Sequence, residues 1–117
     1  MKNFVQEGNK ITIKAPYDAV SGQLVIKNSL HGVAIVDALQ NEELTISTVG
    51  VYELDKDEQA IEQGSKAYYW EDTKQLTPLA NHKEGENEVL HQLVGIFVLD
   101  AKEDDKKARV KLAQTLT

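Results

Sequence analysis

The amino-acid sequence predicts a small all-β domain, and three observations support this fold class. The chain has 117 residues, enough for one hydrophobic core, whereas two halves would each be too small to bury one. Its apolar residues occur mostly in short runs that alternate with polar residues, which is typical of half-buried strands. Only one short segment has the features of a helix. We therefore expect a single β-barrel or β-clip-like domain of short antiparallel strands over residues 9–117, with at most one short helix and with an N-terminal arm over residues 1–8.

The first half of the chain contains five predicted strands. In the segment 10–14, Ile11 and Ile13 share one face and the polar residues share the other. Pro16 ends this strand. The other four strands are expected at residues 24–26, 32–36, 43–49 and 51–54. The run at 32–36 is uniformly apolar, which indicates a strand covered on both faces, and Gly50 marks a bulge or corner.

Asp55 to Gly64 is the one helical candidate. Asp55 or Asp57 can cap a helix there and Gly64 can close it. A loop held in place by Ile61 fits the same segment equally well.

The second half of the chain predicts two further pairs of strands. A hairpin is expected from residues 66–70 and 75–79, and the last pair from residues 93–99 and 108–112. The polar segment 80–88, which contains a glycine, is expected to be a loop. Because aromatic residues are only 6% of the chain, the core should be mostly aliphatic.

One motif occurs twice in the chain. Residues 32–38 and residues 95–101 each contain a glycine, four apolar residues and then Asp-Ala. The glycine permits the close approach of another backbone, and the aspartate is typical of a turn. An internal duplication and two similar hairpins that face the same core both explain the pattern.

The charge balance argues against nucleic acid and anionic membranes as partners. Thirteen basic and nineteen acidic side chains give a formal net charge of −6. The densest basic stretch, residues 106–109, directly follows three acidic residues that cancel its field within a Debye length of about 8–10 Å. The N-terminus lacks the apolar core of a signal peptide, and no apolar run approaches the roughly 20 residues that a bilayer span requires. We expect synthesis to be completed in the cytoplasm.

The sequence contains no recognisable catalytic, cofactor or metal site. The chain has no cysteine, no serine nucleophile elbow and no phosphate-binding loop. A calcium loop beginning at Asp55 would have alanine where glycine must make the turn and lysine where the bidentate glutamate belongs. His31, His82 and His91 lack the short spacing of a zinc pair, so we interpret them as surface or interface residues. We expect a protein that is not an enzyme.

Tyr68-Tyr69-Trp70 is the main aromatic cluster. In a strand, Tyr68 and Trp70 share a face, and such a pair can stack on bases or sugars. The other interpretation is that one face packs in the core while the other covers a sheet edge or a subunit contact. The acidic charge favours the second interpretation, so Tyr68 and Trp70 are expected at an oligomer interface.

The order of these segments resembles a known family. The resemblance extends from Met1 to about Leu112 and depends on the order and spacing of short motifs: the opening Met-Lys-Asn-Phe-Val-Gln-Glu-Gly-Asn, Ala15-Pro16-Tyr17, Ser21-Gly22, Leu30-His31-Gly32-Val33-Ala34, Thr48-Val49-Gly50-Val51-Tyr52-Glu53-Leu54, Gly64 to Asp72, Leu93-Val94-Gly95-Ile96 and Asp100-Ala101. The chain is similar to small phage and prophage proteins first described as a domain of unknown function (DUF2190) and now as capsid cement or decoration proteins. The segment 80–91 is longer and more charged than the family pattern.

The resemblance implies a non-catalytic protein that binds the outer surface of an assembled phage head as a trimer, with the major capsid protein as partner. The arm, with Phe4, Val5 and Gln6, is expected to contact the capsid, because an extended arm can add to the sheet edge of a neighbour. A disordered terminus is the alternative for the arm. The alternative function is a small β-barrel domain that binds a sugar or an oligonucleotide through residues 68–70.

Overall fold

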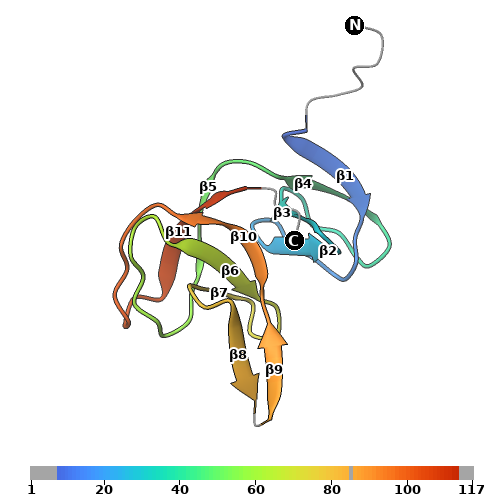
Figure 1. The fold of residues 1–117 in the computed structure, drawn as a ribbon. Coiled ribbons are helices and arrows are strands. Elements are labelled where there is room, and N and C mark those ends of the chain that lie inside the picture. Colours follow the sequence, from blue (N-terminus) through green and yellow to red (C-terminus); the bar gives the residue numbers. More distant parts are fainter. Residues whose placement is uncertain (1–7, 85, 114–117) are drawn as a thin grey trace, which may run out of the picture. The chain divides into compact units, whose positions relative to one another are not determined.

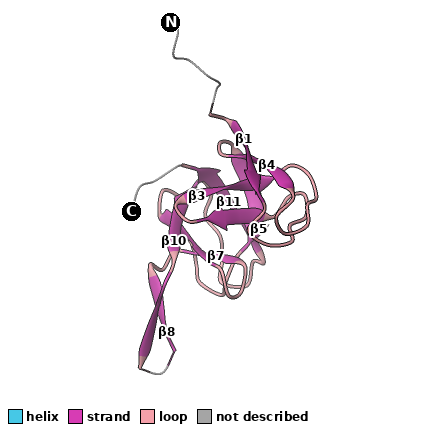
Figure 2. Ribbon diagram, turned by 90° about the vertical axis from the view of Figure 1, so that its right-hand side faces the viewer, coloured by secondary structure: helices cyan, strands magenta, loops and turns pink. Residues whose placement is uncertain are grey.

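The computed structural model describes residues 8–84 and 86–113, and within these ranges it contains strands and no helix (Figures 1 and 2). No helix in the described part of the chain could therefore span a membrane. The strands are β1 (Lys10–Lys14), β2 (Leu24–Lys27), β3 (Leu30–Ala34), β4 (Glu43–Ser47), β5 (Val51–Asp55), β6 (Lys66–Trp70), β7 (Gln75–Thr77), β8 (Asn81–Glu84), β9 (Asn87–Leu90), β10 (Gln92–Phe97) and β11 (Lys107–Leu112).

Three antiparallel sheets contain these strands. Their strand orders are β1-β4-β3-β2, β5-β11-β10-β6-β7 and β8-β9. The all-β class of short antiparallel strands is confirmed. Each sheet has two end strands, and the described residues form no closed barrel.

The strands with a buried face were predicted correctly. Alternation over residues 10–14 and 66–70 coincides with β1 and β6, and both the hairpin β6–β7 and the last pair β10–β11 form as expected. The strand expected at 32–36 ends two residues early. Ile35 and Val36 follow β3 and are exposed rather than covered on both faces.

Two other segments differ from the expectation. Residues 56–64 form no helix: Ile61 is buried and its backbone pairs with Ala101, so the alternative of a loop held by Ile61 is confirmed. The segment 80–88, expected to be a loop, lies mostly in the hairpin of β8 and β9, in which His82 is opposite Val89.

The chain folds into two compact units, with the division after Val49. The first unit contains the four-stranded sheet, whose core consists of Ala15, Ala19, Val25, Ala34, Ala38, Leu44 and Ile46. Ile11, Ile13, Tyr17 and Leu30 pack against this core, and the Tyr17 hydroxyl accepts a hydrogen bond from the Ile26 amide at 3.0 Å. The expectation of one domain over residues 9–117 stays a prediction.

The second unit contains the five-stranded sheet and the β8–β9 hairpin. Its buried apolar residues are Ile61, Ala67, Tyr69, Leu76, Val94, Phe97, Ala108, Val110 and Leu112. Only Tyr69 and Phe97 among them are aromatic, so the prediction of a mostly aliphatic core is confirmed for both units. On β11 burial alternates strictly, as a strand with one covered face requires.

The two units share one main-chain frame. The order β1-β4-β3-β2 is matched by β5-β11-β10-β6, with the same register: Val25 lies opposite Gly32 as Ala67 lies opposite Gly95. The backbone bonds outside the strands recur as well, with equivalent donors and acceptors: Ala15–Glu42 and Lys56–Lys106, Ala19–Ala38 and Ile61–Ala101, Gly22–Ala34 and Gly64–Phe97, Ile35–Thr45 and Val98–Arg109, Thr48–Asn9 and Leu112–Gly50. The repeat therefore comprises four strands and their turns, which is more than one hairpin used twice.

The repeated motif explains part of this frame. Asp37 Oδ1 accepts a hydrogen bond from the Ser21 amide, and Asp100 Oδ1 accepts one from the Gln63 amide, both at 2.7 Å. In each unit the residue after this donor is a glycine with positive φ, 91° at Gly22 and 92° at Gly64. The aspartate thus fixes a turn that only glycine adopts without strain.

The first glycine of the motif lies against a neighbouring backbone. A Cβ on Gly32 would lie 2.6 Å from the carbonyl oxygen of Ser47, and one on Gly95 would come still closer to that of Lys111. Both distances are far shorter than a van der Waals contact, and in both cases the atom in the way belongs to the main chain. Glycine is therefore required at both positions.

We predict that Gly95→Ala and Gly32→Ala each destabilise the fold by about 1–3 kcal/mol, because the new methyl group must displace a strand. Urea unfolding measures the effect. Gly8→Ala is the matched control, since a Cβ there meets nothing within 4 Å, and it should change stability by no more than about 0.5 kcal/mol. Equal stability of Gly95→Ala and Gly8→Ala would contradict the assignment.

Candidate interaction surfaces

The predicted site residues fall into two groups. Phe4, Val5 and Gln6 of the predicted arm lie outside the described residues. Tyr68 and Trp70 lie on β6, where they share the half-buried face while Tyr69 is buried on the other face, as the sequence predicted. The strand itself lies between β10 and β7 in the five-stranded sheet. Whether Tyr68 and Trp70 contact another subunit stays a prediction.

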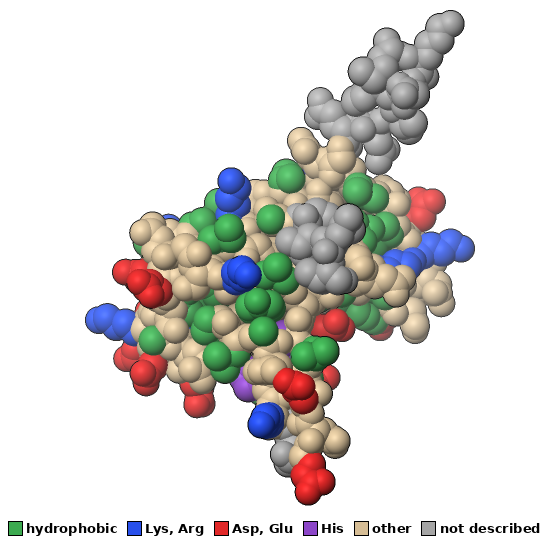
Figure 3. All heavy atoms as spheres, in the orientation of Figure 1, with side chains coloured by type: hydrophobic (Ala, Val, Ile, Leu, Met, Phe, Trp, Pro, Cys, Tyr) green, Lys and Arg blue, Asp and Glu red, His purple; other side chains and the backbone are tan. Residues whose placement is uncertain are grey.

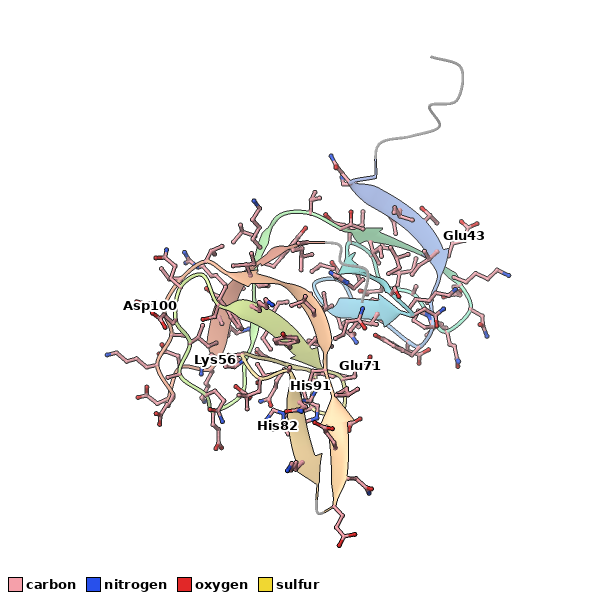
Figure 4. All side chains as sticks on the ribbon, viewed as in Figure 1. Glu43, Lys56, Glu71, His82, His91 and Asp100 are labelled. Carbon is pink, nitrogen blue, oxygen red and sulfur yellow. The ribbon has the colours of Figure 1, made fainter. Side chains whose placement is uncertain are left out.

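Trp70 is covered in part by its own chain. Its ring stacks on His82, with centroids 3.8 Å apart and planes inclined by 18°, and it lies 5.2 Å from the ring of His91. Figure 4 shows the two histidines side by side where the β8–β9 hairpin leaves the sheet. One face of the Trp70 ring is therefore occupied by His82 and is not available to a stacking ligand.

A line of polar groups joins these rings to the loop after β5. His82 Nδ1 and His91 Nε2 face each other at hydrogen-bonding distance, and His82 Nε2 lies 3.8 Å from Asp57 Oδ2. Asp57 is only 7% exposed, and its Oδ1 accepts a hydrogen bond from the Gln59 amide. Within the described ranges, Asp57 Oδ2, Trp70 Nε1 and His91 Nδ1 are buried without a hydrogen-bond partner.

Burial lowers the pKa of His91 from its ordinary value of 6.5, and the neighbouring His82 lowers it further. The carboxylates of Asp57 and Asp72 act in the opposite direction without reversing the shift. His91 therefore favours the neutral form more than an exposed histidine does. The interpretation of all three histidines as surface or interface residues is wrong for His31, which is fully buried on β3.

Sequence reasoning missed this cluster because its members are far apart along the chain. They meet only through the hairpin register and through the loop that follows β5. Across residues 8–84 and 86–113, no group of three or more histidine and carboxylate side chains is placed to hold a metal ion. The cluster consequently offers hydrogen bonding and proton binding within the described structure.

The hairpin extends away from the five-stranded sheet of its unit (Figures 1 and 2). Figure 3 shows acidic and basic side chains on it, and Leu90 near its base is 77% exposed. Beside Leu90 a hollow of about 220 Å³ is lined by Trp70, Glu71, Asp72, Val89 and His91. The hairpin is thus polar along its outer part and partly apolar at its root, the end that joins the five-stranded sheet.

The first unit carries a different exposed surface, which we call the Val20–Leu39 patch and define by Val20 and Leu39. Val20 is 60% exposed and Leu39 is 62% exposed. A hollow of about 440 Å³ between them is lined also by Asp18, Asp37 and Glu42. An apolar centre with a polar rim is the usual anatomy of a protein interface.

The repeat provides an internal comparison for this patch. The positions of Val20 and Leu39 correspond in the second unit to Glu62 and Lys102, since the same backbone bonds surround both pairs. The frame therefore accepts charged side chains at these positions, and folding does not require apolar ones. Alignment of the two halves would have revealed this difference from the sequence, but no single strand pattern does.

Comparison with known proteins identifies the family. Residues 5–112 match the family model described as phage cement protein. No curated protein and no solved structure matches the chain. The matched range includes both units of the repeat and the inserted hairpin, and it is nearly the whole chain. The chain belongs to the phage cement protein family.

Proposed function

We propose that this protein binds the outer surface of an assembled phage head, with the major capsid protein as its partner, and stabilises the shell without catalysing a reaction. The observation that carries the proposal is the family match over residues 5–112. In this proposal the chain is made in the cytoplasm of the bacterial host and functions on the virion.

Binding alone is sufficient for such a function. A protein that binds the assembled shell but not its dissociated subunits shifts the equilibrium toward the shell by mass action. At a free concentration one hundred times the dissociation constant, each bound copy contributes about 2.7 kcal/mol. No active-site chemistry is needed for this effect.

The Val20–Leu39 patch supports contact with another protein chain, and we assign it to the capsid. Its apolar side chains are exposed although the equivalent positions of the second unit are charged. Asp18, Asp37 and Glu42 surround it, so the complementary surface should present basic groups around an apolar centre. The predicted arm is a second contact in this proposal.

We predict that purified protein binds in saturable numbers to heads that lack decoration. Replacing Val20→Glu together with Leu39→Lys should weaken binding about tenfold or more, because an apolar centre is exchanged for charges that the frame tolerates. Co-sedimentation with heads and quantification of bound copies measures both effects.

The matched control changes the equivalent positions of the second unit, Glu62→Gln with Lys102→Gln, and should bind like the wild type. Unsaturable binding to the heads would contradict the proposed function. Wild-type affinity of the Val20→Glu, Leu39→Lys variant would remove the patch from the interface and leave the family assignment intact.

We predict a separate contribution from the arm. The Thr48 hydroxyl donates a hydrogen bond to the Gly8 carbonyl at 2.6 Å, so a deletion should stop before Gly8 and retain this contact. Removal of residues 1–7 should leave the melting temperature nearly unchanged and weaken capture by heads. A large fall in melting temperature with intact capture would assign the arm to folding.

We predict self-association, with a trimer as the proposed state. The edge strands β1 and β5 each alternate between exposed and half-buried residues, and open sheet edges favour pairing or coverage. A trimer would also give one particle three contacts with a lattice, which raises avidity. Light scattering across micromolar concentrations should give three times the chain mass of 13.0 kDa. A single mass near 13.0 kDa at every concentration would show that the isolated protein is a monomer.

A further inference from the structure

The root of the β8–β9 hairpin depends on a contact between two titratable rings. His82 Nδ1 faces His91 Nε2, so one nitrogen must donate a hydrogen and the other must accept it. His82 Nε2 faces the buried carboxylate of Asp57. The neutral pair satisfies both contacts when each ring carries its proton on Nε2, because His91 then donates to His82 and His82 directs its own N–H toward Asp57.

The pair can take up one proton without losing this arrangement. His82 then carries hydrogen on both nitrogens, and His91 accepts at Nε2 while its own proton moves to Nδ1. The carboxylate of Asp57 balances the single positive charge. The hydrogen bond between the rings reverses its direction but remains.

A second proton cannot be accommodated in the same way. Both facing nitrogens would then carry hydrogen, no acceptor would remain between them, and two positive rings would lie with centroids 4.6 Å apart. Among the described residues, Asp57 is the buried carboxylate that faces the pair. Doubly protonated rings would therefore separate.

The other charged groups around the pair come from two elements. Lys56, which is buried in the loop after β5, donates from Nζ to the Asp57 carbonyl at 2.8 Å and adds a positive charge beside the carboxylate. Glu71 and Asp72 lie in the exposed turn after β6, and Asp72 favours protonation of His91. Asp57 and Asp72 thus favour a proton on His91, while burial and the neighbouring His82 oppose it more strongly.

We propose that His82 and His91 form a proton-sensitive clasp that holds the β8–β9 hairpin against Trp70 when the pair carries at most one proton and releases it when both rings are protonated. The released hairpin would swing away from its own sheet while the four-strand frame of the second unit remains folded. The strand β7 stays in the sheet, where Leu76 and Thr77 are fully buried, whereas β8 and β9 form a separate two-stranded sheet. The first unit joins the equivalent strands, β2 and β3, with a two-residue turn, so the frame does not require the β8–β9 hairpin.

The direction of the pH dependence follows from His91. Its pKa is lowered in the closed form, so the released form binds more protons. The clasp is at full strength above the ordinary pKa of about 6.5 and weakens as the pH falls toward the lowered pKa of His91. Across that interval the equilibrium constant for release should rise about tenfold for each pH unit.

Trp70 provides a site-specific measurement because it is the only tryptophan in the chain. Its emission should change in one step below about pH 6.5 as His82 leaves its ring. Amide exchange of β8 and β9, corrected for intrinsic rates, should accelerate over the same interval while β10 and β11 stay protected. The experiment uses the full chain in a buffer with chelator.

Variants separate the clasp from general acid sensitivity. His91→Leu removes the buried proton site and should abolish the step in emission. His82→Phe keeps an aromatic ring against Trp70 and removes the second positive charge, but it leaves His91 buried, so it should move the step to lower pH rather than abolish it. Asp72→Asn removes a carboxylate that favours protonated His91 in the closed form, so the closed form should bind the second proton less well and the step should move to higher pH. Glu62→Gln removes an exposed carboxylate elsewhere in the unit and should leave the step unchanged.

Three results would overturn the proposal. One is an emission without a step between about pH 7.5 and 4.5, the range over which histidines titrate. Another is a step with the wild-type midpoint in a His91→Leu protein whose β10 and β11 amides show that it is folded. The third is loss of protection in β10 and β11 at the same midpoint as the hairpin, which would mean unfolding of the whole unit rather than release.

Discussion

The structure depends on the close passage of two strands at one glycine in each unit. Where β3 passes β4 at Gly32, and where β10 passes β11 at Gly95, a Cβ would collide with a carbonyl oxygen of the neighbouring strand. This approach fixes the register of the central pair, and the central pair positions the outer strands on either side. The aspartate turns at Asp37 and Asp100 then tie the loops to the same pair. A short glycine motif thereby specifies a four-stranded frame twice in 117 residues.

Most of the fold could be predicted from the sequence because burial on one face leaves a period-two pattern. Ile11 and Ile13 reveal β1 in this way, and burial alternates along β11. The β8–β9 hairpin has no such pattern, since it packs on neither face along most of its length. The segment with Ile61 has a helical composition, but its one apolar anchor is used to pair with Ala101. The local sequence does not show whether an apolar residue such as Ile61 will anchor a helix or hold a loop against another segment.

The histidine cluster could not be predicted, for a different reason. His82 and His91 meet because the hairpin returns the chain to its starting point, and Asp57 reaches them from a loop that precedes β6. Contacts of this kind depend on register and on tertiary packing, neither of which a spacing rule for metal ligands or catalytic residues includes. The Val20–Leu39 patch is an intermediate case, because the internal repeat makes it visible once the two halves are aligned.

The extra segment between β6 and β10 occurs in only one of the two copies of the frame, and it shows where additional chain can be inserted. The hydrogen bonds that define the frame are the same with the insertion and without it. This junction is therefore a natural grafting point: a foreign peptide placed between β8 and β9 would leave the strands that hold the unit together untouched.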